Sequence, residues 1–200
     1  MLPSNPTLPA FGVGLAAAAG VYLLLVVTLT TDRQLWPPGD RTRAYYLHWS
    51  LVGAFDVALL VVVATDWGEW LLPRPASLVA GGLLAALGTG VFVHSARVME
   101  SAEVGGVTGD LYTDGPYAYS RNPQYVGMIV GVAGLALLAN SLPATVLAAA
   151  HVGWVLLLPR AEEPHLRAQY GREYERYASQ VPRFVGTGTV RALSRRLAPT

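Results

Sequence analysis

Long stretches without charged side chains alternate with short polar segments along this chain. Residues 10–30 and 75–96 carry no charge, and residues 44–65 carry only Asp56. Residues 122–159 also lack charge, but they are too many for one membrane crossing, and the turn-forming run Asn140-Ser141-Leu142-Pro143 interrupts them. Because a bilayer-spanning helix needs about 20 mostly apolar residues, the pattern predicts an all-α polytopic membrane helix bundle. We expect about five transmembrane helices, the last two forming a hairpin, at residues 10–30, 44–65, 75–96, 123–140 and 142–159.

The polar segment after residue 159 has a helical period of its own. Leu166, Tyr170, Tyr174 and Tyr177 recur at the spacing of one helix face, and charged residues occupy the positions between them. The pattern predicts an amphipathic C-terminal helix that lies against the bundle or the lipid interface.

Composition supports a membrane protein and narrows its chemistry. Charged residues make up 14% of the chain, compared with about 25% in an average soluble domain. All 14 cationic residues are arginine and there is no cysteine, which excludes lysine-based and thiolate catalysis. The net charge of +1 provides no basic surface for nucleic acid. No internal repeat divides the chain, so residues 1–200 are interpreted as one integral membrane domain.

The arginines also predict an orientation. If the C-terminus is cytoplasmic, Arg74 is the one arginine on the outer side. Because cytoplasmic loops of membrane proteins are rich in positive charge, we expect the N-terminus outside and the C-terminus in the cytoplasm. The exclusive use of arginine is typical of a GC-rich prokaryotic genome, so we expect a prokaryotic cell membrane.

Two polar segments flank the predicted hairpin on the cytoplasmic side. Residues 113–127 contain a Gly-Pro turn, three tyrosines and Arg121, followed by Asn122-Pro123 as a helix start. The second segment is the acidic pair Glu162-Glu163. Taken separately, the first is also typical of an aromatic belt and the second of a solvated helix end.

Because both ends of a hairpin return to the same edge of the bundle, these segments should meet. Tyr117, Asn122, Pro123 and Tyr125 are then expected near Glu162. Carboxylates suit the amine of a ligand and aromatic faces suit its positive centre. The combination favours a zwitterionic, cationic, adenine-bearing ligand.

The two segments carry a family resemblance. The string GPYAYSRNPQYVG, followed by EEPHLRAQYGREYERYASQVPRF, resembles the isoprenylcysteine carboxyl methyltransferase and phospholipid methyltransferase superfamily of integral membrane enzymes. It covers about residues 105–184. The resemblance implies S-adenosyl-L-methionine as cofactor, and membrane lipids or another lipophilic small molecule as methyl acceptor.

The resemblance also implies site residues. Glu162 is expected to hold the cofactor with Glu163 beside it, and Arg121 is a candidate catalytic residue that orients the loop or an anionic acceptor. The other implied cofactor-binding residues are Gly109, Asp110, Leu111, Tyr112, Tyr117, Asn122, Pro123, Gln124 and Tyr125. The chain departs from the family at two positions. Asn122 replaces the histidine of the Arg-His-Pro-x-Tyr motif, and Leu158 replaces a substrate-facing arginine of the isoprenylcysteine enzymes.

Polar residues inside the predicted spans are further candidates, because ionisable groups within a membrane are often functional. Asp56 is the strongest, as a substrate-side catalytic base or as the structural partner of a histidine, and His94 and His151 follow.

The histidines and acids lack zinc-protease spacing, so no metal is expected. Small-residue faces containing Gly81, Gly88 or Gly134 fit contacts within one chain or between two, which leaves the oligomeric state open.

Two other function classes remain open at this point. Membrane sterol reductases, which use NADPH, have a similar tail, matched here by Tyr170-Gly171, Tyr174, Tyr177 and residues 181–184. A non-enzymatic scaffold that kept the fold and lost the site is the third reading, and Asn122 is its main support.

Overall fold

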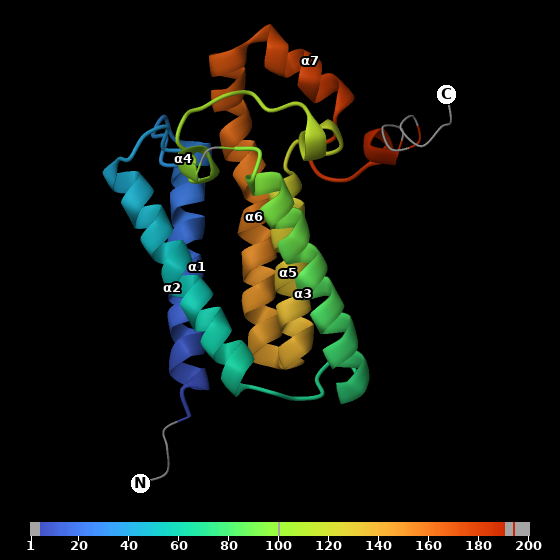
Figure 1. Ribbon diagram of the computed structural model, residues 1–200. Coiled ribbons are helices and arrows are strands. Elements are labelled where there is room, and N and C mark those ends of the chain that lie inside the picture. Colours follow the sequence, from blue (N-terminus) through green and yellow to red (C-terminus); the bar gives the residue numbers. More distant parts are fainter. Residues whose placement is uncertain (1–4, 100, 191–193, 195–200) are drawn as a thin grey trace.

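Five long helices stand side by side in the computed structural model, which describes residues 5–99, 101–190 and 194 (Figure 1). They are α1 (Thr7–Thr30), α2 (Arg43–Thr65), α3 (Arg74–Ala96), α5 (Pro123–Ala139) and α6 (Leu142–Tyr170). Three short elements gather at one end of the bundle: α4 (Ser101–Val104), the 3-10 helix η1 (Gly115–Ala118) and α7 (Arg172–Gln180). No β-strand occurs in the described residues, which confirms the all-α prediction.

The bundle has the surface of a membrane protein. Helices α1, α2, α3 and α6 are long and apolar enough to cross a membrane, whereas α5 is apolar but has only 17 residues. Large apolar side chains such as Leu23, Val57 and Leu83 point outward and are more than 60% exposed. An exposed apolar surface of this extent fits lipid rather than water. The chain is therefore a multi-pass membrane protein.

A tight turn joins α5 to α6. Asn140 ends α5 in the left-handed conformation (φ 51°), and the Ser141 side chain caps α6 by accepting a hydrogen bond from the Ala144 backbone N–H. The fully buried Asn140 amide also accepts from the backbone N–H groups of Leu71 and Leu72 (2.8 and 3.3 Å) and donates to the Leu72 carbonyl (2.6 Å). The turn residues thereby fix the α2–α3 loop as well.

Glycines bring α3 and α5 into backbone contact. A Cβ added to Gly88 of α3 would lie 2.1 Å from the backbone nitrogen of Gly131, and one added to Gly134 of α5 would lie 2.2 Å from that of Ala85. Close approach at small residues is how membrane helices commonly pack. In this chain these glycines make contacts within one molecule.

Gly88→Ala should therefore destabilise the protein, because the methyl group overlaps backbone atoms that can move only if α3 and α5 separate. Overpacking of this kind typically costs about 1–3 kcal/mol. Gly90→Ala on the same helix is the matched control, because nothing lies within 4 Å of its added Cβ and alanine is the better helix former. Thermal unfolding in detergent should give a lower Tm for G88A and an unchanged or higher Tm for G90A. Equal values would contradict the backbone contact.

The C-terminal helix differs from the prediction. Helix α6 does not end at residue 159 but continues through Pro159 and Pro164 to Tyr170. Gly171 (φ 53°) then breaks the chain direction, and α7 begins at Arg172. The predicted aromatic stripe is thus divided between two helices, and of the two positions expected for it, the bundle and the lipid interface, it takes the first and lines a pocket there. The prediction of one continuous tail helix was wrong because glycine permits the positive φ that redirects the backbone.

Candidate functional site

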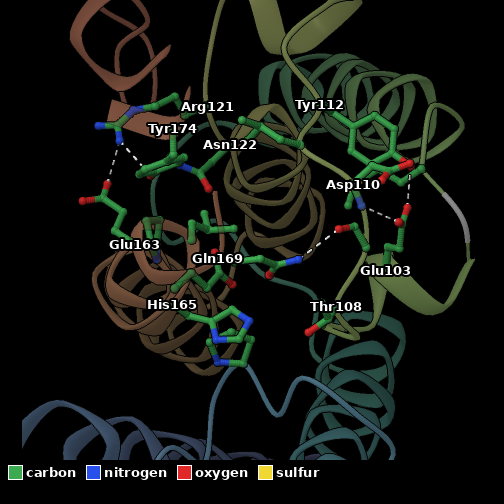
Figure 2. A pocket seen from close by; sticks show the side chains of 18 of the residues that line it. Glu103, Thr108, Asp110, Tyr112, Arg121, Asn122, Glu163, His165, Gln169 and Tyr174 are labelled. Carbon is green, nitrogen blue, oxygen red and sulfur yellow. Dashed lines mark hydrogen bonds and ion pairs between the residues drawn. The ribbon is translucent and has the colours of Figure 1, made fainter. Parts of the chain in front are cut away.

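A pocket lies at the end of the bundle where α3 and α6 finish. One face of α6 forms its wall through Glu162, His165, Leu166, Gln169 and Tyr170, which follow at helical spacing. Further lining comes from loop 105–112, α4, η1, the start of α5, helix α7 and Trp36-Pro37. Figure 2 shows side chains from these separate segments facing one another.

The structure brings most of the predicted residues to this pocket. Every predicted cofactor-binding residue except Pro123 lines it, and so does Arg121. Pro123 is buried in the first turn of α5. Asp56 does not line the pocket: it is exposed on the outer face of α2. Of the two histidines, His151 is buried beside Phe55 and Trp154, and His94 borders a shallow groove on α3.

Glu162 is held at the inner wall of the pocket, on the part of α6 beyond the apolar residues 142–159. Its Oε1 accepts hydrogen bonds from Trp36 Nε1 (2.8 Å) and from the Tyr125 hydroxyl. Burial raises the pKa of Glu162, and the two hydrogen bonds offset only part of that rise. The carboxyl is thereby fixed in position with one oxygen engaged.

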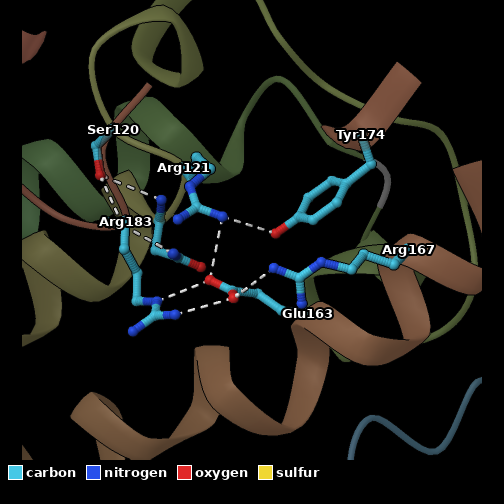
Figure 3. Close-up of polar contacts among 7 residues, drawn as sticks. Ser120, Arg121, Glu163, Arg167, Tyr174 and Arg183 are labelled. Carbon is cyan, nitrogen blue, oxygen red and sulfur yellow. Dashed lines mark hydrogen bonds and ion pairs between the residues drawn. The ribbon is translucent and has the colours of Figure 1, made fainter. Parts of the chain in front are cut away.

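Glu163 has a different environment from its neighbour. Its buried carboxylate accepts from Arg183 Nε at 2.7 Å and forms ion pairs with Arg121 (3.1 Å) and Arg167 (3.5 Å), as Figure 3 shows. Burial alone would raise the pKa of Glu163, but the Arg183 hydrogen bond and the three positive charges outweigh it and lower the pKa. These contacts fix the tail to the bundle. Glu163 is thus engaged within the protein and has little capacity for a ligand.

Arg121 and Asn122 join the same structural network. Arg121 Nη1 donates to the Tyr174 hydroxyl (3.0 Å), and the Arg121 backbone N–H donates to the Pro182 carbonyl (2.9 Å). The Asn122 amide Nδ2 donates to the Arg183 carbonyl (2.8 Å). These bonds make Arg121 and Asn122 positioning residues for the segment that follows α7.

Glu103 shapes loop 105–112. Its carboxylate accepts from the Asp110 backbone N–H (2.9 Å) and from the Tyr112 hydroxyl (2.6 Å). Gly109 passes so close that an added Cβ would lie 1.6 Å from Glu103 Oε1, so a larger residue there would displace the Glu103 carboxylate. The Gly109 carbonyl accepts from Gln169 Nε2 (3.2 Å) and from the Tyr170 hydroxyl. The loop is therefore tied to α6 across the pocket.

Tyr117 supplies an aromatic wall. Its hydroxyl accepts from Gln124 Nε2 and donates to Met99 Sδ, both at 3.0 Å, while its carbonyl accepts from the Tyr177 hydroxyl (2.7 Å). Burial raises the pKa of Tyr117 to about 12, and nearby carboxylates add to the shift against the opposing Gln124 hydrogen bond. The phenol is neutral at physiological pH and offers an uncharged ring face.

Sequence reasoning missed several lining residues. Trp36 comes from a loop and lies far along the chain from its partner Glu162, so it gives no local signal, and Glu103 comes from the short helix α4, which was not predicted. His165 and Gln169 did have a local signal in the sequence. They continue the helical spacing that begins at Glu162, so they are expected in the pocket once α6 extends to Tyr170.

The fold and pocket define a class: a multi-pass helical membrane protein with an acidic, aromatic pocket at one end of its bundle. Residues 76–173, from α3 into the start of α7, match the family model described as phospholipid methyltransferase. The chain belongs to the superfamily of integral membrane methyltransferases that includes the isoprenylcysteine and phospholipid enzymes.

Of three curated relatives, two are named as methyltransferases and one as a metal resistance protein. The chain is 38% identical over 74 residues to the protein-S-isoprenylcysteine O-methyltransferase of Schizosaccharomyces pombe, covering 36% of this chain and 31% of the relative. It is 30% identical over 142 residues to the cobalt-zinc-cadmium resistance protein CzcN of Cupriavidus metallidurans, covering 68% and 61%. It is 24% identical to the phosphatidylethanolamine N-methyltransferase of Neosartorya fischeri, covering 100% and 22%. The chain thus spans less than two thirds of each of these relatives. No solved structure matches it.

Proposed function

We propose that this chain is an S-adenosyl-L-methionine-dependent methyltransferase acting on a lipophilic or membrane-embedded acceptor. One observation carries the proposal: residues that the resemblance selects from two separate segments line a single pocket. If the two segments had lain far apart in the fold, the resemblance to the family could have arisen by chance.

The donor set of the pocket fits that cofactor. Its lining holds four carboxylates, Glu103, Asp110, Glu162 and Glu163, and among the described lining residues Arg121 is the one arginine or lysine. Glu163 neutralises Arg121, so the remaining acids favour a ligand with positive charge. The Tyr112 and Tyr117 rings lie 6.1 Å apart and offer faces for an aromatic base or a positive centre.

When bound, S-adenosyl-L-methionine supplies an electrophilic methyl group on a sulfonium sulfur. The residues of this chain would contribute positioning. Glu162, fixed by Trp36 and Tyr125, holds the polar end of the ligand, and the loop tied to α6 by Gly109 encloses it. Alignment of donor and acceptor can supply roughly 7–11 kcal/mol of a barrier.

The acceptor is proposed to arrive from the lipid phase, because the pocket lies at the end of membrane-type helices. Leu158, at the position of the substrate-facing arginine in the isoprenylcysteine enzymes, is buried and absent from the lining, and Arg160 is exposed. An isoprenylcysteine carboxylate is therefore not the acceptor that we favour.

The proposed test is calorimetric titration of detergent-purified protein with S-adenosylhomocysteine, and with NADPH in parallel. Saturable binding of S-adenosylhomocysteine alone is the expected result. Binding of NADPH alone would overturn the proposal in favour of a reductase, and binding of neither would favour a scaffold.

We also propose five membrane crossings, with α5 as the fourth, an outer N-terminus and a cytoplasmic C-terminus. The described arginines other than Arg74 lie toward the end of the bundle that carries α7, which supports this orientation. The chain has no cysteine, so a single exposed cysteine can be labelled without background. Glu69→Cys should react with an impermeant maleimide on intact cells, and Glu173→Cys only after permeabilisation. The reverse pattern would invert the topology.

A further inference from the structure

His165 and Glu162 lie one turn apart on α6, and both line the pocket. The helix is continuous through both positions, so residues three apart share a face and have Cβ atoms about 5–6 Å from each other. Figure 2 shows His165 on the side of the pocket that faces loop 105–112. His165 lies outside the acidic pair and outside the site residues that the family resemblance implies.

Gln34 determines which nitrogen of His165 carries the proton. Gln34 Nε2 donates to the Pro37 carbonyl (2.8 Å), which fixes the orientation of the amide. The same nitrogen lies 3.1 Å from His165 Nδ1. An amide N–H can bond only to a lone pair, so Nδ1 is the acceptor and the neutral imidazole carries its hydrogen on Nε2. His165 therefore offers an N–H donor on the side of the ring away from Gln34.

Glu162 offers the complementary group. Trp36 and Tyr125 both donate to Oε1, and Oε2 accepts no hydrogen bond from the described residues. This wall of the pocket thus presents a carboxylate oxygen and an imidazole N–H one helical turn apart.

Three other side chains with N–H donors in the pocket are engaged within the protein, whereas Thr108 also lines the pocket and Arg121 keeps a buried Nε without a hydrogen-bond partner among the described residues. Arg121 pairs with Glu163 and Tyr174, Gln124 donates to Tyr117 and Met99, and Gln169 donates to Gly109. A ligand carboxylate would therefore meet His165 without breaking one of these contacts.

We infer that Glu162 and His165 together bind the α-amino acid end of the ligand, with Glu162 Oε2 accepting from its ammonium and His165 Nε2–H donating to its carboxylate. The ammonium and the carboxylate of the ligand are attached to one carbon, which fits the spacing of Glu162 and His165, one helical turn apart on α6. This inference rests on the proposed function, because S-adenosyl-L-methionine is the ligand that carries such an end. It makes His165 a cofactor-positioning residue.

The test compares two ligands on three proteins by calorimetry. The ligands are S-adenosylhomocysteine and its decarboxylated analogue, which retains the amine. Wild-type protein should bind the first about tenfold more tightly, the usual effect of a hydrogen bond to a charged group. In His165→Asn, the amide stays near Gln34 but does not reach the position of Nε2, so the preference should fall toward unity. In His165→Gln, the amide nitrogen occupies the position of Nε2, so the preference should be largely retained.

The outcomes separate the inference from the proposed function. If wild-type protein binds S-adenosylhomocysteine and His165→Asn keeps the full preference for the carboxylate, the role of His165 is overturned and the proposed function stands. If wild-type protein binds neither ligand, both fall. A preference lost equally in His165→Asn and His165→Gln would also overturn the donor role. Binding of 5′-methylthioadenosine, which lacks the amino acid, should be the same for all three proteins.

Discussion

Replacing Glu162 with glutamine should reduce the affinity for S-adenosylhomocysteine by about 100-fold, because the ligand's ammonium loses its charged partner in a buried site. The substitution is conservative toward the protein. Glutamine retains an Oε1 that accepts from Trp36 Nε1 and the Tyr125 hydroxyl, and it replaces Oε2 with an amide that cannot accept. Calorimetry on the wild type and E162Q measures the difference. Glu175→Gln, on the exposed face of α7, is the matched control and should bind as the wild type does.

The apo stability of E162Q distinguishes lost binding from lost structure. Because burial raises the folded-state pKa of Glu162, the protonated form is favoured by folding, and its contribution to stability is lost as the pH rises through that pKa. Above that pKa the ionised carboxylate therefore destabilises the wild type. E162Q should have an equal or higher Tm there, and the difference should vanish below the ordinary glutamate pKa of 4.5. Weak binding together with a lowered Tm would refute a direct role for the charge.

The helix positions could be predicted because the membrane imposes a simple rule on the sequence. Predicted spans at residues 44–65, 75–96 and 123–140 correspond to α2, α3 and α5 within about one residue at each end. Apolar stretches no longer predict the helix bounds where a helix continues beyond its apolar residues. After Pro159 charged residues become frequent, yet the backbone of α6 stays helical to Tyr170. Each of the two prolines removes one backbone hydrogen bond, and that loss does not outweigh the packing of the α6 face that lines the pocket.

Only those site residues that lie in short continuous motifs could be predicted from the sequence. Glu162, Tyr117 and Tyr125 belong to strings of neighbouring residues, and a hairpin must bring such strings together. Trp36 lies 126 residues from Glu162 along the chain, and no spacing rule links them. The roles of the acidic pair were equally hidden. Two adjacent glutamates look alike in sequence, but on a helix they point about 100° apart, so one carboxyl bonds Trp36 and Tyr125 and the other pairs with the arginines.

Removing the charge of Glu163 should have the largest effect on stability. Glu163→Gln leaves Arg121, whose side chain is 12% exposed, without its buried counter-charge, and it frees Arg183 from a bidentate contact. Breaking a buried ion pair by removing one partner typically costs about 3–5 kcal/mol. We expect the lower end of that range, about 3 kcal/mol, because Arg167 and Arg183 are partly exposed and screened by solvent.

The damage should be concentrated in the tail. Arg183 and the neighbouring Pro182 carbonyl hold the segment after α7 against Arg121 and Asn122 (Figure 3). Limited trypsin digestion of E163Q in detergent should therefore cut at Arg172 and Arg176 faster than in the wild type. Arg167→Ala removes the most exposed of the three arginine partners and is the control, with an expected change within about 1 kcal/mol.

The pH dependence gives an independent check on the cause. The arginines lower the folded-state pKa of Glu163, so its stabilising contribution is present above pH 4.5 and is lost as the pH falls through the lowered value. The Tm difference between wild type and E163Q should be constant from neutral pH to about 4.5 and should shrink only in stronger acid. Glu162 has the opposite sign, because its pKa is raised. A Tm difference for E163Q that persists unchanged in strong acid, where Glu163 is protonated, would show that packing, and not the charge shared with Arg121, holds the tail in place.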